Sequence, residues 1–351
     1  MSLSLPLKHT LPLVLSMGDP AGIGPEIILR AVRECPELLT QLVVAGDMAT
    51  LRRASLITTG TQERASSALM LADIGSLSDW PLVPPGCLAV VQACAPTGLV
   101  PLGQVSAQAG QVAADCIRFA AHAALHHQAR AVVTAPIHKE ALSAAGVPYP
   151  GHTEMLQALA AEHLQKSLAE LPVRMMLSCP GLRTVLVSIH VSLREALQAV
   201  QREQVLQTLL ITHRHFQATG FENPRIAVAG LNPHAGEGGL FGQEEIEQIA
   251  PAIREAHALG LNVSGPHAPD TVFMRARQGA FDVVVAMYHD QGLIPVKLLG
   301  LEHGVNTTLG LPFVRTSPDH GTAFDLAGSG LASAASLLAA IDAALNATAV
   351  V

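Results

Sequence analysis

The chain has 351 residues, of which 49% are hydrophobic and 14% are charged. This composition excludes a disordered or collagen-like chain, and the length suffices for two domain-sized units or one large one. The formal charge is −7 and there is no long run of Lys or Arg, which argues against nucleic-acid binding, since that depends on clustered cations. No segment reaches the roughly 18 uninterrupted apolar residues of a membrane span, so no membrane association is expected.

Short apolar runs typical of strands buried on both faces recur along the chain, and helical patterns rich in Ala, Leu, Gln and Glu separate most of them. The expected strands are residues 13–16, 41–45, 88–92, 131–134, 174–177, 184–189, 225–229 and 282–287. The expected helices are residues 25–34, 110–126, 192–217 and 244–259, with a closing helix at 331–347. Residues 58–85, rich in Ser, Gly and Pro, are expected to form an irregular surface excursion.

This alternation of strands and helices predicts an α/β fold with a largely parallel sheet. The length suggests two lobes with a cleft between them, although no shift in composition marks the boundary. Ligands of such sheets bind at the carboxyl ends of the strands, so the polar residues that follow each apolar run are the candidate site residues.

Five cysteines show neither a CxxC pair nor the spacing of a metal finger: Cys35, Cys87, Cys94, Cys116 and Cys179. They are interpreted as buried thiols in a reducing compartment, which fits the cytoplasm.

A glycine-rich turn follows the first expected strand, with the sequence GDPAGIGPE from Gly18 to Glu26. Backbone N–H groups of such a turn could cradle a phosphate. The segment matches neither GxGxxG nor a P-loop, and a tight turn that leads into a helix with Pro25 at its first position explains it equally well.

Three of the expected strands are followed by a histidine: His190, His234 and His289. Neutral imidazoles are common ligands of Zn²⁺-like ions, and three of them leave a coordination position open for substrate. The alternative is that each is a hydrogen-bonded structural residue, because no HExxH-type spacing links them.

Several polar residues could hold an anion. His152 and Thr153 stand in a loop that opens a helix, where they could serve either as anion donors or as an ordinary helix cap. Lys297 and Arg315 lie among apolar or Gly/Pro residues, which favours anion binding over surface ion pairing, and Asn306 could donate an amide N–H.

Motifs along nearly the whole chain resemble the 4-hydroxythreonine-4-phosphate dehydrogenase family of pyridoxal phosphate biosynthesis. Besides GDPAGIGPE they are TAPIHKEAL (134–142), GHTE (151–154), LNPHAGEGG (231–239), GPHAPDT (265–271), AMYHDQGLIPVK (286–297) and VNTTLGLPFVRTSPDHGTAFDLAG (305–328). His138 stands where the family commonly has Asn, and the segment around His190 matches only loosely.

The resemblance implies a fold of the isocitrate and isopropylmalate dehydrogenase type, with two α/β/α lobes around a cleft. The expected lobes are residues 1–145 plus 310–351 on the cofactor side and residues 146–309 on the metal and dimer side. It also implies a homodimer whose active site is shared across the interface.

The resemblance assigns roles to individual residues. His190, His234 and His289 would bind a divalent metal (Zn, Co or Mg). The substrate would be held by His152, Thr153, Lys297, Asn306 and Arg315. Lys297, Asp270 and Asp290 would act in catalysis, and NAD or NADP would contact His320, Gly321, Thr322 and Asp325.

The expected reaction is NAD(P)-dependent oxidation of 4-phosphooxy-L-threonine, followed by decarboxylation to 3-amino-2-oxopropyl phosphate. Three alternatives stay open. They are a related dehydrogenase acting on 4-phospho-D-threonate, 4-phospho-D-erythronate or a cis-dihydrodiol carboxylate, a metal-dependent phosphate-ester hydrolase, and a binding protein without catalysis.

Overall fold

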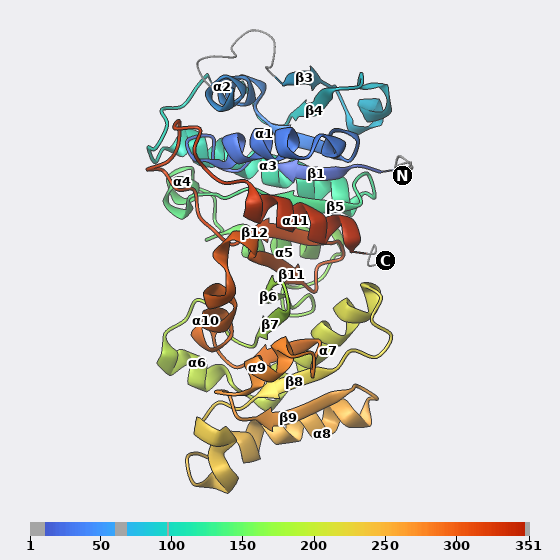
Figure 1. Ribbon diagram of the computed structural model, residues 1–351, viewed down its shortest axis with the longest axis vertical. Coiled ribbons are helices and arrows are strands. Elements are labelled where there is room, and N and C mark those ends of the chain that lie inside the picture. Colours follow the sequence, from blue (N-terminus) through green and yellow to red (C-terminus); the bar gives the residue numbers. More distant parts are fainter. Residues whose placement is uncertain (1–10, 60–68, 97, 348–351) are drawn as a thin grey trace. The chain divides into compact units, whose positions relative to one another are not determined.

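The computed structural model describes residues 11–59, 69–96 and 98–347. Apart from a few residues at the C-terminus, the chain divides into two compact units. Unit 1 consists of Met1–Leu171 and Pro312–Leu345, and unit 2 of Pro172–Leu311. Each contains a sheet flanked by helices (Figure 1).

Unit 1 has a parallel sheet with the strand order β3-β4-β2-β1-β5-β12. Its strands are β1 (Leu13–Ser16), β2 (Leu42–Gly46), β3 (Met70–Asp73), β4 (Cys87–Gln92), β5 (Ala131–Thr134) and β12 (Arg315–Pro318). Its helices are α1 (Gly24–Glu34), α2 (Met48–Thr58), α3 (Ala107–Leu125), α4 (Lys139–Ala144), α5 (His152–His163) and α11 (Ala335–Asn346), with 3₁₀ turns η1 (Pro36–Thr40) and η2 (Leu77–Leu82).

Local chemistry explains where the helices of unit 1 begin and how closely they pack. The Asp47 carboxylate accepts the backbone N–H of Thr50 at 2.8 Å and so caps α2. The Ser106 hydroxyl caps α3 in the same way. Gly110 allows α3 to approach α4 closely, because a Cβ at this position would lie only 1.9 Å from the carbonyl oxygen of Ala141.

Unit 2 has the strand order β11-β6-β7-β10-β8-β9, in which β6 is antiparallel to both of its neighbours and the other pairs are parallel. Its strands are β6 (Arg174–Cys179), β7 (Leu182–Leu186), β8 (Ile226–Ala229), β9 (Val263–His267), β10 (Val283–Ala286) and β11 (Val305–Leu309). Its helices are α6 (Leu193–Ala199), α7 (Arg202–Ala218), α8 (Ala250–Ala258), α9 (Val272–Arg277) and α10 (His289–Leu299), with the shorter turns η3 (Pro233–Gly239), η4 (Glu245–Ile249) and η5 (Leu301–His303).

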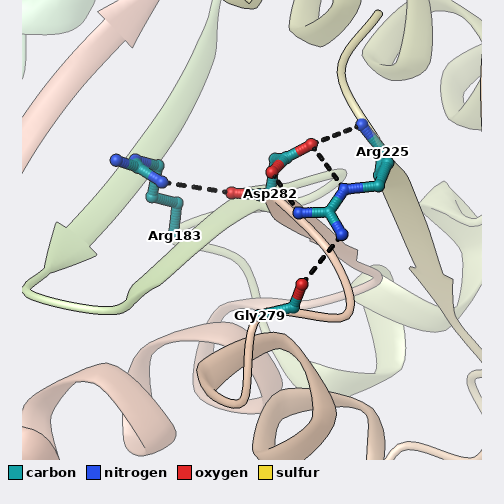
Figure 2. Close-up of polar contacts among 4 residues, drawn as sticks. All are labelled: Arg183, Arg225, Gly279 and Asp282. Atoms are coloured by element: carbon teal, nitrogen blue, oxygen red, sulfur yellow. Dashed lines mark hydrogen bonds and ion pairs between the residues drawn. The ribbon is translucent and has the colours of Figure 1, made fainter.

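An arginine fork fixes the amino ends of three adjacent strands of unit 2 (Figure 2). Arg225, just before β8, donates two side-chain hydrogen bonds to the carboxylate of Asp282, just before β10, at 3.1 and 2.7 Å, and a third to the carbonyl of Gly279. Arg183 of β7 donates to the carbonyl of Asp282 at 3.4 Å. These hydrogen bonds link the amino ends of β7, β10 and β8 to one another.

The expected α/β class with a mostly parallel sheet is confirmed, and each of the eight expected strands overlaps an observed one. The prediction of one helix over residues 192–217 is wrong, because non-helical backbone at Val200 and extended backbone at Gln201 separate α6 from α7. The helix expected over 244–259 starts as the π-helical turn η4.

The prediction that residues 58–85 are irregular is also wrong for their described part, which contains β3 and η2; residues 60–68 lie outside the described residues. All five cysteines are unbridged, but only Cys116 and Cys179 are buried, so the expectation of buried thiols is wrong for the other three. Within the described ranges, no helix is long and apolar enough to span a membrane.

Candidate functional site

Three histidines of unit 2 follow the carboxyl ends of three adjacent parallel strands. β10 lies between β7 and β8, with Ala286 paired to Leu186 and Val285 to Val228. His190 comes after β7, His289 after β10 and His234 after β8. Because adjacent parallel strands have their carboxyl ends at the same edge of the sheet, this topology places the three histidines at that edge.

The structure brings two of these histidines close together. The ring centroids of His190 and His289 lie 5.7 Å apart. His190 and His234 are exposed and both have positive φ angles, 46° and 53°, which are uncommon for residues other than glycine. Such backbone conformations concentrate at functional sites, where the surrounding structure must hold them in place.

Two buried polar side chains hold the loops that carry His234 and His289. Gln291 accepts the backbone N–H of Met287 and donates to the carbonyl of Gly230, both at 2.7 Å, so it links the end of β10 to the end of β8. The carboxylate of Glu245 accepts the backbone N–H groups of Leu231 and Asn232, each at 2.7 Å.

These two residues were missed from the sequence. Gln291 stands inside the motif that contains His289, and that position was its only signal. Glu245 lies in a run of acidic and polar residues, where nothing in the pattern distinguishes a buried carboxylate from a solvated one.

One of the three histidines, His289, has a neighbour typical of a metal ligand. The Nδ1 atom of His289 lies 2.7 Å from the Asp290 carboxylate, which leaves Nε2 to bind an ion, an arrangement common among metal-binding histidines. Among the described residues of this single chain, however, no three His, Cys, Asp or Glu side chains converge closely enough to hold an ion.

A buried arginine forms the centre of a second polar group, in unit 1. Arg315 is 2% exposed, and its Nη2 donates to the Thr134 hydroxyl at 2.7 Å. Burial lowers the pKa of its guanidinium to about 10, with Glu154 opposing the shift, so Arg315 carries its charge at neutral pH. A buried cation of this kind is suited to binding an anionic ligand.

His152, the first residue of α5, lies in the field of this arginine. Burial lowers the pKa of His152 well below its ordinary value, and the charge of Arg315 lowers it further. The imidazole is therefore neutral at pH 7. Its Nε2 is enclosed and has no hydrogen-bond partner among the described residues, which is costly in a folded protein unless a ligand supplies one.

The other expected substrate and catalytic residues are spread over four elements of the fold and differ in exposure. Thr153 is half-buried in the first turn of α5, and Asn306 is half-buried on β11. Lys297 is exposed in the last turn of α10, seven residues beyond Asp290 and on the same face of that helix. Asp270 is exposed just before α9.

The glycine-rich turn after β1 is a tight turn, as one of its two interpretations predicted. Gly18 has a φ of +78°, and Pro25 stands at the start of α1. The Glu26 carboxylate accepts the backbone N–H groups of Gly328 and Gly330 at 2.6 and 2.9 Å. It thereby ties α1 to the segment that follows the expected cofactor residues.

The expected cofactor loop packs against this turn. Thr322 is buried, and its carbonyl accepts the backbone N–H of Ile23 at 3.0 Å. The Nδ1 atom of His320 lies 3.0 Å from the carbonyl of the adjacent Gly321, and Asp325 is exposed. His138 stacks on Phe324 of the same loop, with ring centroids 4.8 Å apart.

The fold is that of an α/β protein with mostly parallel strands, and its two candidate polar groups are the histidines that follow β7, β10 and β8 and the group around the buried Arg315. The family model "Pyridoxal phosphate biosynthetic protein PdxA" matches residues 37–344. A 4-hydroxythreonine-4-phosphate dehydrogenase from Beijerinckia indica is 49% identical, with 94% of this chain and 93% of the relative covered. The chain belongs to this family and is a dehydrogenase.

Two further proteins are similar over nearly their whole length. A D-threonate 4-phosphate dehydrogenase from Salmonella typhimurium is 44% identical, with 96% of this chain and 99% of the relative covered. The crystal structure of a 4-hydroxythreonine-4-phosphate dehydrogenase from Klebsiella pneumoniae is 41% identical and has a TM-score of 0.83, covering 96% of this chain and 99% of its own.

Proposed function

We propose that the protein catalyses the NAD(P)-dependent, divalent-metal-assisted oxidation of 4-phosphooxy-L-threonine to 2-amino-3-oxo-4-phosphooxybutanoate. This product decarboxylates to 3-amino-2-oxopropyl phosphate, a precursor of pyridoxal 5'-phosphate. The observation that carries the proposal is the position of three histidines at the carboxyl ends of β7, β10 and β8. Family membership and the activity of the Beijerinckia relative support it.

In this proposal unit 2 supplies the metal ligands His190, His234 and His289. A divalent ion held by these residues would supply Lewis-acid chemistry at the substrate hydroxyl, and NAD(P) would supply the hydride acceptor. Imidazole ligands favour Zn²⁺ or Co²⁺ over Mg²⁺, which prefers oxygen.

Arg315, with its buried charge, grips one anionic end of the substrate, and the neutral His152 offers it a hydrogen bond. Thr153, Lys297 and Asn306 complete the substrate set.

Proton transfer is assigned to Lys297, Asp270 and Asp290, of which Asp290 also orients His289. The cofactor is assigned to the loop of unit 1 that carries His320, Gly321, Thr322 and Asp325. Unit 1 is thus the cofactor side and unit 2 the metal side. We assign the enzyme to the cytoplasm, because its five cysteines are unbridged.

We further propose a homodimer whose two chains share each active site. Within the described part of one chain, His190 and His289 lie close together but no three potential ligands converge, so ligands from a second copy would complete the set. Unit 2 also exposes large apolar side chains on the elements that carry or follow the histidines. They are Leu193, Leu197, Leu240, Phe241, Ile294 and Leu298. Apolar side chains exposed in this way are typical of a subunit interface.

The Salmonella relative favours a second candidate, oxidation of D-threonate 4-phosphate by the same residues. The test measures reduced nicotinamide formed from NAD⁺ or NADP⁺ with 4-phosphooxy-L-threonine, 4-phospho-D-threonate, 4-phospho-D-erythronate or a cis-dihydrodiol carboxylate, before and after chelation and on adding Zn²⁺ or Co²⁺. Metal-dependent reduction with 4-phosphooxy-L-threonine as the best substrate is the expected result. Preference for another substrate, or turnover without nicotinamide, would overturn the proposal.

A further inference from the structure

Three exposed histidines lie together where two helices of unit 1 end. His122 stands in the last turn of α3, His126 directly follows that helix, and His163 is the last residue of α5. The rings of His122 and His126 stack with their centroids 3.8 Å apart, and the ring of His163 meets that of His126 edge-on at 4.9 Å. We call these residues the helix-end histidine cluster; none of them has a role in the proposed dehydrogenase chemistry.

The spacing of His122 and His126 suits chelation of one ion by two side chains. The backbone N–H of His126 donates to the carbonyl of His122 at 3.0 Å, so helical geometry continues as far as His126. Residues four apart lie on the same face of a helix, and two histidines at this spacing bind Zn²⁺ in the H-E-x-x-H motif. The stacked rings show that both imidazoles reach the same part of the surface.

The ring nitrogens needed for metal binding are available. The Nδ1 atom of His126 lies 2.9 Å from the carbonyl oxygen of His122. Since a carbonyl only accepts, Nδ1 carries the proton and Nε2 keeps its lone pair, as is common for metal-binding histidines. Partial desolvation, together with His126 and His163, lowers the pKa of His122. The His122 ring is therefore neutral at pH 7, the state in which an imidazole binds a metal.

The ends of the two helices favour a positive charge at the cluster. The last carbonyl groups of an α-helix carry a partial negative charge that stabilises cations nearby. Helix α3 ends at Leu125 and α5 at His163, and the contact between the rings of His126 and His163 brings these two ends side by side. A cation bound by the cluster is therefore stabilised by both helices.

We propose that the helix-end histidine cluster binds a divalent transition-metal ion, with His122 and His126 as a chelating pair and His163 as a third ligand. Among the residues that the structure describes, no three potential ligands converge as their side chains stand. His163 joins the pair by rotation of its exposed side chain, a motion that is fast at a protein surface. Imidazole sites bind Cu²⁺ more tightly than Co²⁺, Ni²⁺ or Zn²⁺. The cluster therefore binds Cu²⁺ at concentrations at which it does not retain Co²⁺.

Diethyl pyrocarbonate, which acylates imidazoles that hold no metal, tests the cluster residue by residue. The full-length protein without a polyhistidine tag is treated with and without Cu²⁺, digested with trypsin and analysed by mass spectrometry. Cleavage after Arg118 and Arg130 gives one peptide with His122, His126 and His127, in which fragmentation assigns each acylated ring. Cu²⁺ is expected to slow acylation of His122 and His126, whereas His127 reacts at an unchanged rate. Equal rates at His122 and His126 with and without Cu²⁺ would overturn the proposal.

Substitutions show which side chains hold the ion. The measured quantity is the concentration of free Cu²⁺, set by a chelator buffer, that half-protects the remaining histidines of the cluster. Loss of a residue that only orients a ligand costs about 10- to 100-fold in metal affinity, so His122→Asn, His126→Asn and His163→Asn should each raise this concentration by at least about 10-fold. His127→Asn is the matched control and should not change it. An unchanged concentration in His122→Asn or His126→Asn would overturn the chelating pair, and in His163→Asn it would overturn the third ligand.

The same digest keeps this inference separate from the proposed catalytic metal. His190, His234 and His289 lie in other tryptic peptides, so their acylation is measured independently. Protection of the cluster without protection of these three residues would support the inference and count against the catalytic metal site. None of these readouts depends on dehydrogenase activity.

Discussion

Arg315 and Thr134 join β12 to the end of β5 through a hydrogen bond of 2.7 Å inside unit 1. The threonine hydroxyl thereby orients a guanidinium that is almost completely buried. This pair holds one cation of a chain with few charges at a defined position, as the proposed binding of an anionic substrate requires.

Replacing Arg315 with lysine distinguishes the effect of its positive charge from the effect of its planar guanidinium. Arg315→Lys keeps the positive charge but loses the planar fork, so we expect KM for the phosphorylated substrate to rise by about 10- to 100-fold, as loss of a charged hydrogen bond implies. Steady-state kinetics measure this effect. The control Arg118→Lys changes a half-buried arginine of α3 that pairs with Asp115, and it should leave KM unchanged. An unaltered KM in Arg315→Lys would remove the residue from the substrate site.

Gln291 is expected to stabilise unit 2 through its two buried hydrogen bonds. Gln291→Ala leaves the N–H of Met287 and the carbonyl of Gly230 without this partner, so the free energy of unfolding should fall by about 2–4 kcal/mol. Denaturant unfolding provides the measurement. Gln243→Ala, which removes an exposed glutamine from a similar loop, should cost less than about 0.5 kcal/mol. Equal effects of the two variants would contradict the account.

Gln291 and Glu245, which hold the loops of His289 and His234, also show what cannot be predicted from the sequence. The strand-end histidines and Arg315 could be predicted as candidates because hydrophobic runs locate strand ends and a charge among apolar residues is conspicuous. The hydrogen bonds between the Glu245 carboxylate and the loop before His234 depend on contacts between segments that are separated in the sequence. No periodicity encodes those contacts. Polar strands such as β9 and β11 were missed for a related reason, since glycine, proline and threonine mask the apolar pattern.

Asp290 is expected to raise metal affinity by orienting His289. Its carboxylate lies 2.7 Å from His289 Nδ1, and loss of such a partner commonly costs about 10- to 100-fold in affinity. Asp290→Asn should therefore weaken Zn²⁺ binding by this amount in a competition assay with a chromogenic chelator. Asp73→Asn, on β3 of unit 1, is the control and should bind Zn²⁺ like the wild type. Unchanged affinity in Asp290→Asn would exclude the orienting role.

Stability is expected to fall in acid partly through His215 of α7. Burial, with a further effect from Arg183, lowers the pKa of His215 to about 4. Between the unfolded value near 6.5 and about 4 the unfolded chain binds more protons than the folded chain, so stability decreases as the pH falls through this window.

His215→Gln removes this titration. The variant should reduce the loss of unfolding free energy between pH 7 and pH 4 by about 1–2 kcal/mol, since the ring is half-buried and partly screened. The exposed His257 of α8 offers a matched control, His257→Gln, that should follow the wild-type curve. Parallel pH curves for the wild type and His215→Gln would contradict the assignment.

The most direct test of the central claim is a Co²⁺ titration followed by visible absorption, with the wild type and the variants His190→Ala, His234→Ala and His289→Ala. If the three strand ends supply one metal site, the wild type binds one ion per chain and each variant loses the spectrum of the bound ion, while His303→Ala, an exposed histidine of η5, keeps it. Unchanged Co²⁺ binding in any of the three site variants would contradict a shared metal site at the ends of β7, β10 and β8.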